Sequence, residues 1–212
     1  MTSIADIRKD YRLRSLSETD ADSPFQLFDR WWQEAITARL EEVNAMTLAT
    51  ASLEGVPAAR VVLLKGFSEK GFVFFSNYDS AKGAQLAENP RAALVFFWKE
   101  LERQVRVTGL VSKTSEEESD AYFFSRPEGS RIGAWASPQS QVIASREWLE
   151  ANELQCRERF QGGPVARPPH WGGYVVKPVT IEFWQGRASR LHDRLQFSLQ
   201  DDGTWKLERL AP

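Results

Sequence analysis

The chain has 212 residues, which is room for one generous domain or two small ones. Its 42% apolar and 26% charged residues exclude a disordered or collagen-like chain. The formal net charge of −2 excludes the broad basic surface of a general nucleic-acid-binding protein, so we expect no nucleic-acid partner.

Cysteine and histidine are too scarce for several kinds of site. The single cysteine excludes a disulfide framework, and the two histidines, His170 and His192, are too far apart for an ordinary zinc site, so we expect no metal. The N-terminus has charges but no apolar signal segment, and no apolar run reaches membrane-spanning length. We therefore expect a soluble protein of a reducing compartment, the cytoplasm, with no membrane partner.

The first half of the chain is predicted to be a polar arm, a helix and several strands. Residues 1–23 are polar and are expected to form a mobile arm. Pro24 then begins a helix, and the segment SAKGAQLAENP is a second, short helix that Pro90 ends. The first helix carries apolar residues at helical spacing, namely Phe25, Phe28, Trp32, Ile36 and Leu40. The predicted strands are residues 46–52, 60–67, 72–77 and 91–98.

The middle of the chain continues with a strand, a helix and a loop. Residues 102–112 alternate between apolar and polar side chains, which predicts a strand with one buried face. Ser115 is expected to cap a helix that ends before Pro127. Residues 128–140 are rich in Gly and Ser and are predicted to be a loop.

The last part of the chain is predicted to be a helix followed by three strands. The helix over residues 145–160 places Cys156 on its apolar face, so we interpret this cysteine as a core residue and not as a nucleophile. Strands that follow one another without regular βαβ alternation predict a mainly β fold, a mostly antiparallel barrel-like sheet with peripheral helices. We expect one domain over residues 24–212. The three strands are residues 174–184, 190–198 and 204–210.

The string RASRLHDRLQF could carry a binding surface. In an extended strand Arg190, His192 and Arg194 share one face, because side chains alternate. This face is either solvated or built for an anion or an electron-rich ring, to which guanidinium groups offer forked donors.

Two lysines are placed where a lysine alone is unfavourable. Lys82 lies in the first turn of a predicted helix, where the helix dipole disfavours a cation unless an anion is bound there. Lys65, with Arg60, brackets an apolar strand, and a buried lysine needs a charged ligand or a carboxylate. Ordinary solvated side chains are the alternative.

A third set of polar residues follows the helix that begins near Ser115. Tyr122 and Arg126 are four residues apart on one helix face, and Ser130 and Arg131 follow. Hydroxyl and guanidinium groups in this arrangement form a natural phosphate cradle, although a solvated helix face is the alternative. Together with the many aromatic residues, these clusters suggest a phosphorylated planar cofactor and a second phosphorylated ligand.

Several long strings are specific enough to indicate a family. They cover nearly the whole chain from about Pro24 to its C-terminus, and the strings around RLHDR and SRPEGSR are the most specific. Together they resemble the pyridoxine/pyridoxamine 5′-phosphate oxidase family. The strings are RVVLLKGFSEKGFVFFSN, ENPRAALVFFW, LERQVRVTG, YFFSRPEGSRIGAWASPQS, HWGGYVVKP, IEFWQG, RLHDR and LERLAP.

The resemblance implies a fold and an activity. The fold is an FMN-binding split β-barrel that works as a homodimer, with both subunits lining each FMN site. The activity is oxidation of pyridoxamine or pyridoxine 5′-phosphate to pyridoxal 5′-phosphate in vitamin B6 metabolism. Dioxygen is the acceptor, hydrogen peroxide is formed, and the amine also releases ammonia. Two alternatives stay open: a nicotinamide-dependent flavin reductase on the same barrel, and a non-catalytic carrier of FMN or pyridoxal phosphate.

The resemblance also implies which residues bind FMN. Arg60 and Lys82 would hold its phosphate, and the backbone of RVVLLK would run beside the flavin. Phe75-Ser76 stands where Tyr-Thr is common, and Ala81 stands where a basic residue is common. The implied cofactor-binding residues are Arg60, Val61, Val62, Leu63, Leu64, Lys65, Phe75, Ser76, Ala81, Lys82, Gln104, Gln139, Ser140, Trp184 and Arg194.

The residues implied for the substrate come from four parts of the chain. Arg190 and His192 would be catalytic, beside the pyridine ring and its reacting C4′ substituent. The N-terminal arm, through Arg8 and Tyr11, would close over the substrate, which gives the arm the role of a lid. The implied substrate-binding residues are Arg8, Tyr11, Lys65, Tyr122, Arg126, Ser130, Arg190, Leu191 and His192.

Overall fold

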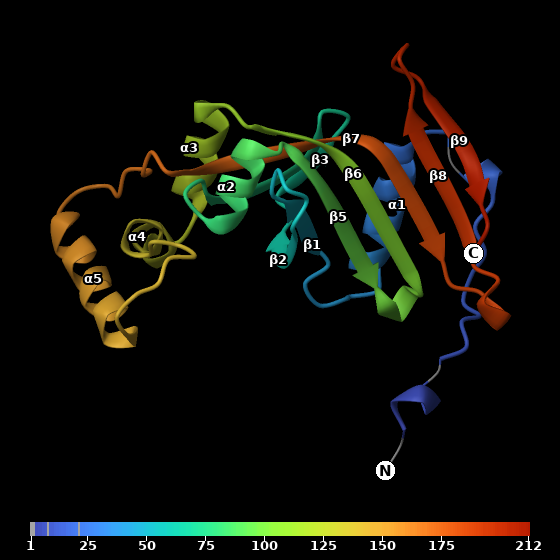
Figure 1. Cartoon of the computed structure of the whole chain (residues 1–212), viewed down its shortest axis with the longest axis horizontal. Helices are drawn as coiled ribbons and strands as arrows, with labels where there is room; N and C mark the ends of the chain where they lie inside the picture. Colours follow the sequence, from blue (N-terminus) through green and yellow to red (C-terminus); the bar gives the residue numbers. More distant parts are fainter. Residues whose placement is uncertain (1–2, 8, 21) are drawn as a thin grey trace.

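The strands of the computed structural model form one antiparallel sheet (Figure 1). The structure describes residues 3–7, 9–20 and 22–212, and within them the sheet has nine strands. Their order is β2-β1-β5-β6-β7-β4-β3, with the β8–β9 hairpin paired to β7, which confirms the predicted antiparallel sheet. The strands are β1 (Ala45–Ala51), β2 (Pro57–Leu63), β3 (Gly66–Ser68), β4 (Gly71–Asn77), β5 (Arg91–Trp98), β6 (Arg103–Lys113), β7 (Trp171–Gln185), β8 (Asp193–Leu199) and β9 (Trp205–Leu210).

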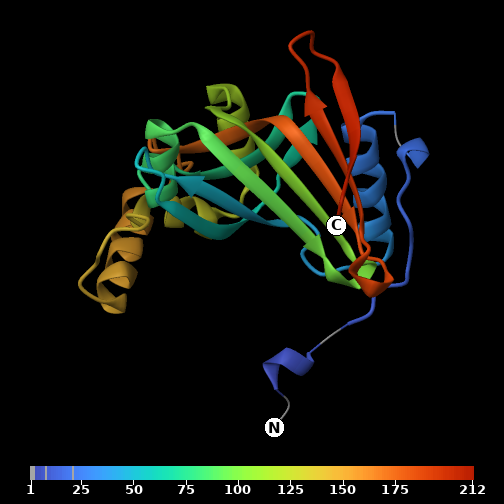
Figure 2. The same cartoon turned by 45° about the vertical axis from the view of Figure 1, so that its right-hand side comes forward.

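β7 is the longest strand, and it belongs to two parts of the sheet. Its first half pairs with β4, and its second half pairs with β8. The register between β6 and β7 shifts at Gly109, opposite Pro178, whose nitrogen cannot donate a ladder hydrogen bond. A Cβ on Gly109 would lie 2.2 Å from the Lys177 carbonyl oxygen, so the close approach requires glycine. From this point the β8–β9 hairpin extends away from helices α2–α5 (Figure 2).

Helix α1 (Pro24–Thr37) covers the sheet with a stripe that overlaps the predicted one but is rotated from it. Its start is confirmed, because Ser23 caps it by accepting the backbone N–H of Gln26. The buried residues include Phe28 and Trp31, whereas Ile36 is 47% exposed. Of the predicted residues Phe28 is fully buried, and Phe25, Trp32 and Leu40 are half-buried against the same core, so the face that meets the sheet is rotated only slightly from the predicted one.

The remaining helices gather at the other end of the sheet (Figure 1). The predicted loop over residues 128–140 is wrong for its first part, because Pro127 begins a helix there that buries Ile132 and Ala136. Helices α3–α5 share a second small core, in which Cys156 is half-buried, whereas α2 buries Leu86 in the main core. The helices of this end are α2 (Ala81–Glu88), α3 (Glu116–Ser125), α4 (Glu128–Ala136) and α5 (Arg146–Arg159).

Two predicted strands differ at positions that matter for the site. The strand predicted over 60–67 is two strands, and Lys65 is exposed in the break between them, so the interpretation of a buried strand lysine is wrong. The strand predicted over 190–198 begins only at Asp193, after the 3₁₀ turn η4 (Ala188–Arg190). Because Arg190 has a φ of 63°, the chain is not extended there, and the strand face expected for Arg190, His192 and Arg194 does not form.

The predicted N-terminal arm has two parts. Its second part lies along the sheet: Leu16 is buried and donates its backbone N–H to Asp193, and Glu18 in η2 (Glu18–Asp20) forms an ion pair with Arg209. Its first part, with η1 (Ile4–Asp6), is exposed and stands clear of the sheet (Figure 2).

Neither a membrane helix nor a metal cluster is found in the described residues. No helix there combines the length and the apolar character needed to cross a bilayer. No group of three His, Cys, Asp or Glu side chains in this part of the chain is arranged to hold a metal ion.

Candidate functional site

One cavity, of about 360 Å³, is formed where β2 and β4 meet helices α2 and α3. Most of the residues that the sequence implies for the FMN and for the substrate phosphate line it. We call it the cation pocket, because four of its lining residues are cations. The cations are Arg60, Lys65, Lys82 and Arg126. The other lining residues are Val61, Val62, Leu63, Phe75, Ser76, Asn77, Tyr122, Gln139 and Trp171.

Lys82 is the centre of a polar cluster in the cation pocket. Its Nζ donates to Gln139 Oε1 at 2.7 Å, to Ser76 Oγ at 3.0 Å and to Ser80 Oγ at 3.2 Å. Ser80 also caps α2, so Lys82 lies in the first turn of this helix, as predicted. Burial lowers the pKa of Lys82, and the nearby charge of Arg60 lowers it further. The negative charge of a bound anion would favour the charged form of Lys82 and so offset both effects on its pKa.

Arg60 and Lys82 have no acidic partner among the described residues. Arg60 reaches inward from β2, where it donates to Thr50 Oγ1 at 2.6 Å and to the Leu48 carbonyl. Burial lowers the pKa of Arg60. Two neighbouring cations without a carboxylate repel each other, so their arrangement suits a phosphate.

A stack of aromatic rings forms the other wall of the cation pocket. Phe75 lies on Tyr122 with ring centroids 4.0 Å apart, and both are nearly parallel to Trp171. The Arg126 guanidinium covers Trp171 at 4.6 Å, and its Nη1 is buried with no hydrogen-bond partner in the described residues. A buried unpaired donor is costly, so Arg126 is poised for an acceptor that comes from outside this chain.

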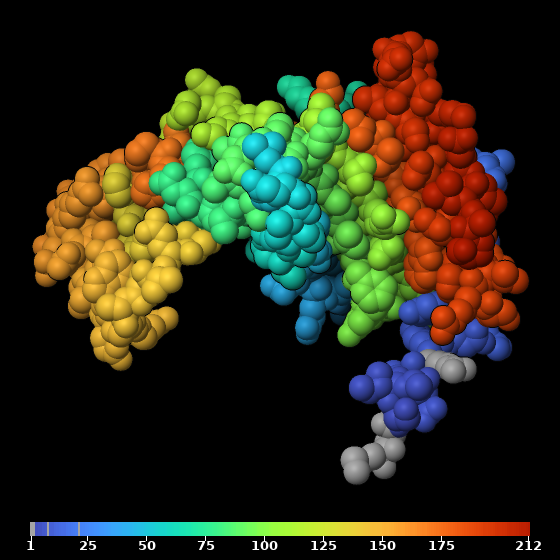
Figure 3. Space-filling view, viewed as in Figure 1, coloured from blue at the N-terminus to red at the C-terminus, as the bar shows by residue number. Residues whose placement is uncertain are grey.

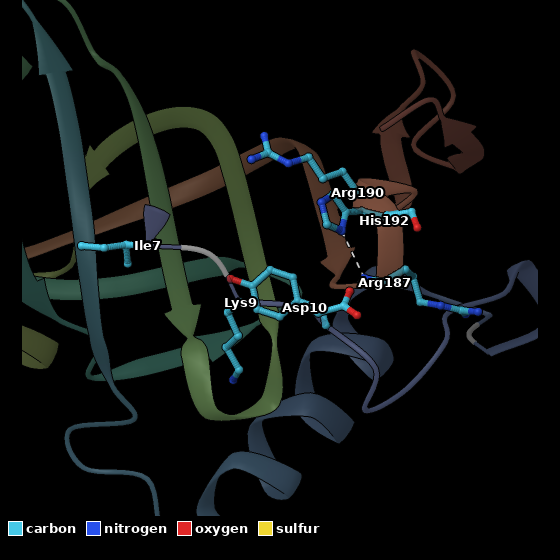
Figure 4. Close-up of a pocket in the computed structure, with 8 residues that line it drawn as sticks. Ile7, Lys9, Asp10, Arg187, Arg190 and His192 are labelled. Carbon is cyan, nitrogen blue, oxygen red and sulfur yellow. Dashed lines mark hydrogen bonds between the residues drawn. The ribbon is translucent and has the colours of Figure 1, made fainter. Parts of the chain in front are cut away.

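A second cavity, of about 530 Å³, lies at the opposite end of the sheet between the N-terminal arm and the turn before β8 (Figure 4). We call it the histidine pocket. The arm contributes Tyr11, whose ring centroid is 5.6 Å from that of Trp184 and 6.0 Å from that of His192. The lining residues are Ile7, Lys9, Asp10, Tyr11, Arg187, Ser189, Arg190 and His192.

His192 is held in one orientation in the histidine pocket. Its Nδ1 accepts the backbone N–H of Arg187 at 3.1 Å (Figure 4). The centroid of its ring lies 4.6 Å from that of Trp184. Since an N–H can only donate, Nδ1 carries no proton and the proton of the neutral ring is on Nε2. Burial lowers the pKa of His192, and the charge of Arg190 lowers it further. The ring is therefore a neutral donor through Nε2.

Arg190 and Arg194 have different surroundings. Arg190 is exposed at the rim of the histidine pocket. Arg194 lies in β8, where it donates to Glu182 Oε1 at 2.8 Å and to the carbonyl oxygen of Ala211 at 2.8 Å. In the sheet register Gln104, Trp184 and Arg194 are direct neighbours, so these three implied cofactor residues form one row.

The sequence-implied residues thus fall into two groups, and the sheet separates them. The described residues that line the cation pocket and those that line the histidine pocket have no member in common. The helical end and the β8–β9 end of the molecule lie apart in the space-filling view (Figure 3). Other implied residues line neither pocket: Leu64, Ala81, Gln104, Ser130, Ser140, Trp184, Leu191 and Arg194. Arg8 lies outside the described residues.

Some lining residues carried no signal that could be used in advance. Trp171 belongs to the string HWGG, yet its role in stacking on Tyr122 depends on the pairing of β7 with β4. Lys9, Asp10 and Arg187 enter the histidine pocket only because the arm lies across the end of β7.

Comparison with protein families gives two matches. Residues 32–160 match the model described as pyridoxamine 5′-phosphate oxidase. Residues 171–212 match the model described as the pyridoxine 5′-phosphate oxidase C-terminal dimerisation region, which supports a homodimer.

Curated proteins with the same description align over their full length. A pyridoxine/pyridoxamine 5′-phosphate oxidase of Trichormus variabilis is 58% identical, over 99% of this chain and 98% of its own length. Pyridoxine/pyridoxamine 5′-phosphate oxidase 1 of Ralstonia nicotianae is 61% identical, over all of both chains.

Solved structures agree with the fold. PhzG from Burkholderia lata 383, in complex with tetrahydrophenazine-1-carboxylic acid, has a TM-score of 0.85 at 32% identity, over 91% of this chain and 94% of its own. A pyridoxamine 5′-phosphate oxidase-related, FMN-binding protein from Nostoc punctiforme has a TM-score of 0.70 at 18% identity, over 91% of this chain and all of its own, which speaks for the fold alone.

Proposed function

The chain belongs to the pyridoxamine 5′-phosphate oxidase family, and on this premise we propose that it oxidises pyridoxamine or pyridoxine 5′-phosphate to pyridoxal 5′-phosphate with FMN as cofactor. The observation that carries the proposal is that one pocket holds two groups of cations that have no acidic partner in the described residues. Lys82 with Arg60 suits one phosphate, and Arg126 with its orphaned Nη1 suits a second. An oxidase of a phosphorylated substrate that uses FMN needs both.

The cation pocket fits FMN in the charge of its lining residues and in the open strand beside it. Lys82 and Arg60 would hold the phosphate at the start of α2, where backbone N–H groups also favour an anion. Strand β2 lies at the edge of the sheet with Val61 and Leu63 exposed, so its backbone is accessible to a planar ring. When bound, FMN supplies the two-electron acceptor for the substrate and passes the electrons to dioxygen, which yields hydrogen peroxide.

The residues of this chain would bind and orient the substrate. Arg126, Lys65, Tyr122 and Ser130 would hold the phosphate, with the Lys65 ammonium 5.8 Å from the Tyr122 ring. In the histidine pocket His192 would donate a hydrogen bond from Nε2 to the C4′ substituent. Loss of hydrogen from an amine gives an imine, whose hydrolysis releases ammonia.

Arg190 and Tyr11 would complete the substrate site. The Arg190 guanidinium would lie beside the pyridine ring. Tyr11 lines the histidine pocket from the arm, where it would close the pocket and exclude water. The N-terminal arm, residues 1–23, would thus act as a lid on the single domain 24–212.

The two pockets would meet across a dimer. Because they lie at opposite ends of one chain, a cation pocket of one subunit and a histidine pocket of its partner can form one composite site. The match of residues 171–212 to a dimerisation region supports this arrangement. The cytoplasm is the proposed location, in line with a sequence that has a single cysteine and therefore no internal disulfide.

A spectroscopic and kinetic experiment tests the proposed function. The purified protein should be yellow and should form peroxide in air when pyridoxamine 5′-phosphate is added. Unphosphorylated pyridoxamine should have a much lower kcat/KM than pyridoxamine 5′-phosphate. Arg126→Ala should reduce this difference in kcat/KM between the two substrates. Turnover that requires a nicotinamide donor would indicate a reductase, and bound flavin without turnover of either substrate would indicate a carrier.

A further inference from the structure

Glu102 is a buried acid that holds the N-terminal arm. It lies at the turn between η3 (Lys99–Leu101) and β6, and its side chain is 4% exposed. Its Oε2 accepts the backbone N–H of Arg12 at 2.8 Å and that of Leu13 at 3.0 Å, and its Oε1 lies 3.5 Å from Lys9 Nζ. All three contacts run from the carboxylate to the arm.

The main chain of Glu102 holds the end of β7 at the same time. Its carbonyl accepts the N–H of Gly186 at 2.7 Å and the Gln185 side-chain amide at 3.2 Å. Tyr11 packs directly on Gly186, where an added Cβ would lie 2.7 Å from Tyr11 Cγ. Glu102 therefore joins two segments whose contact sets the position of Tyr11.

We propose that Glu102 is a positioning residue for the substrate, which acts by fixing Tyr11 over His192. The inference rests on the proposed function and deepens it. Two hydrogen bonds to one buried oxygen fix both the place and the direction of the backbone that follows Tyr11. Without them, substrate binding must itself order the arm, so its affinity falls while the reaction of the bound complex is unchanged.

Three variants test the role of Glu102. Glu102→Leu removes the acceptor and keeps the packing, whereas Glu102→Gln keeps a carbonyl oxygen that can accept both N–H groups. Glu100→Leu is the matched control, because Glu100 lies in the same turn and, among the described residues, forms an ion pair with Lys99 alone, which is exposed. For Glu102→Leu we expect the KM for pyridoxamine 5′-phosphate to rise about tenfold, with kcat and FMN content within about twofold of wild type. Glu102→Gln and Glu100→Leu should resemble wild type.

Limited trypsin digestion gives a readout that needs no enzymatic activity. In Glu102→Leu, cleavage after Lys9, Arg12 or Arg14 should be about tenfold faster, because the arm opens more often. If the wild-type protein does not turn over the substrate but Glu102→Leu is still cleaved faster than wild type, the proposed function is wrong while the role of Glu102 in holding the arm is supported. Unchanged KM and cleavage in Glu102→Leu, a fall in kcat alone, or a Gln variant as defective as the Leu variant would overturn the inference.

A second variant covers a failure of Glu102→Leu to fold. Gly186→Ala places a methyl group against Tyr11 and leaves the buried carboxylate in place. It should raise KM by a similar factor with kcat unchanged. An unchanged KM in this variant would also overturn the inference.

Discussion

At the scale of the residue, the buried and half-buried cations are of two kinds, those with an acidic partner and those without one in the described residues. Buried Arg103 is fully engaged: it donates to Glu34 at 2.7 Å and to Gln185 at 2.9 Å, and it covers the Trp31 ring. Lys82 is half-buried as well, yet it meets only uncharged oxygens in the described residues. The first arrangement stabilises the fold, whereas the second awaits an anion.

Lys82→Ala should weaken FMN binding and leave the fold intact. Loss of one charge-assisted contact to a phosphate corresponds to roughly 1–3 kcal/mol of binding free energy. Titration of the apoprotein with FMN, followed by quenching of flavin fluorescence, measures the change. Lys70→Ala, in the exposed turn between β3 and β4, is the control and should bind FMN as wild type does. Equal affinities for both variants would contradict the assignment of Lys82.

His192 should titrate below the ordinary histidine pKa of 6.5, because burial and Arg190 both disfavour its charged form. The unfolded chain then binds the proton more readily, so this residue lowers stability as the pH falls below 6.5 and has no effect well above it. Protonation also breaks the bond from the Arg187 N–H to Nδ1, so kcat/KM should fall in the same range. Histidine NMR signals against pH give the midpoint, and His170→Gln assigns them. A midpoint above 6.5 would refute the neutral-donor role.

At the scale of the element, the junction of η4 and β8 separates the two arginines. Arg190 lies in a turn with a left-handed backbone, and Arg194 lies two residues into a strand. The turn brings His192 against Trp184 at the end of β7. A continuous strand would have placed His192 on the face of Arg194, so the break in the strand creates the histidine pocket.

Arg190→Ala and Arg194→Ala should therefore fail in different ways. Arg190→Ala should lower kcat/KM about tenfold or more while FMN stays bound, because Arg190 is exposed and has no ion pair in the described residues. Arg194→Ala should loosen FMN, since the resemblance assigns this residue to the cofactor. It should also lower the Tm, because it leaves the buried Glu182 with Arg106 alone. Peroxide assays beside FMN titrations distinguish the two. Loss of FMN in Arg190→Ala with retention in Arg194→Ala would contradict this assignment and exchange the cofactor and substrate roles of the two arginines.

At the scale of the whole molecule, β7 links the two pockets. Trp171 at its start stacks in the cation pocket, and Trp184 near its end packs on His192. One extended strand of 15 residues thus keeps the two groups apart within a subunit. A composite site then requires a second copy.

Mixing two impaired variants tests whether the site is shared. Arg126→Ala damages the cation pocket and Arg190→Ala the histidine pocket. If each site uses one pocket from each subunit, a heterodimer has one intact site. Random reassortment of subunits makes half of the dimers mixed, and each mixed dimer has one intact site out of two. The mixture should therefore reach about a quarter of wild-type activity. Sites formed within one chain would give no recovery, and unmixed variants serve as the control.

Local sequence patterns were enough to predict the strand-rich fold, the start of α1 at Pro24, the helix after Ser115 and the residue types of both clusters. These follow from local periodicity, capping and turn chemistry, which act over a few residues. The tertiary structure decided which stripe of α1 is buried, where β8 begins and that residues 128–136 are helical. It also decided that Tyr11 meets His192 and that Glu102 holds the arm. Those contacts join positions about 90 or more residues apart, and burial by distant elements outweighs local propensity there.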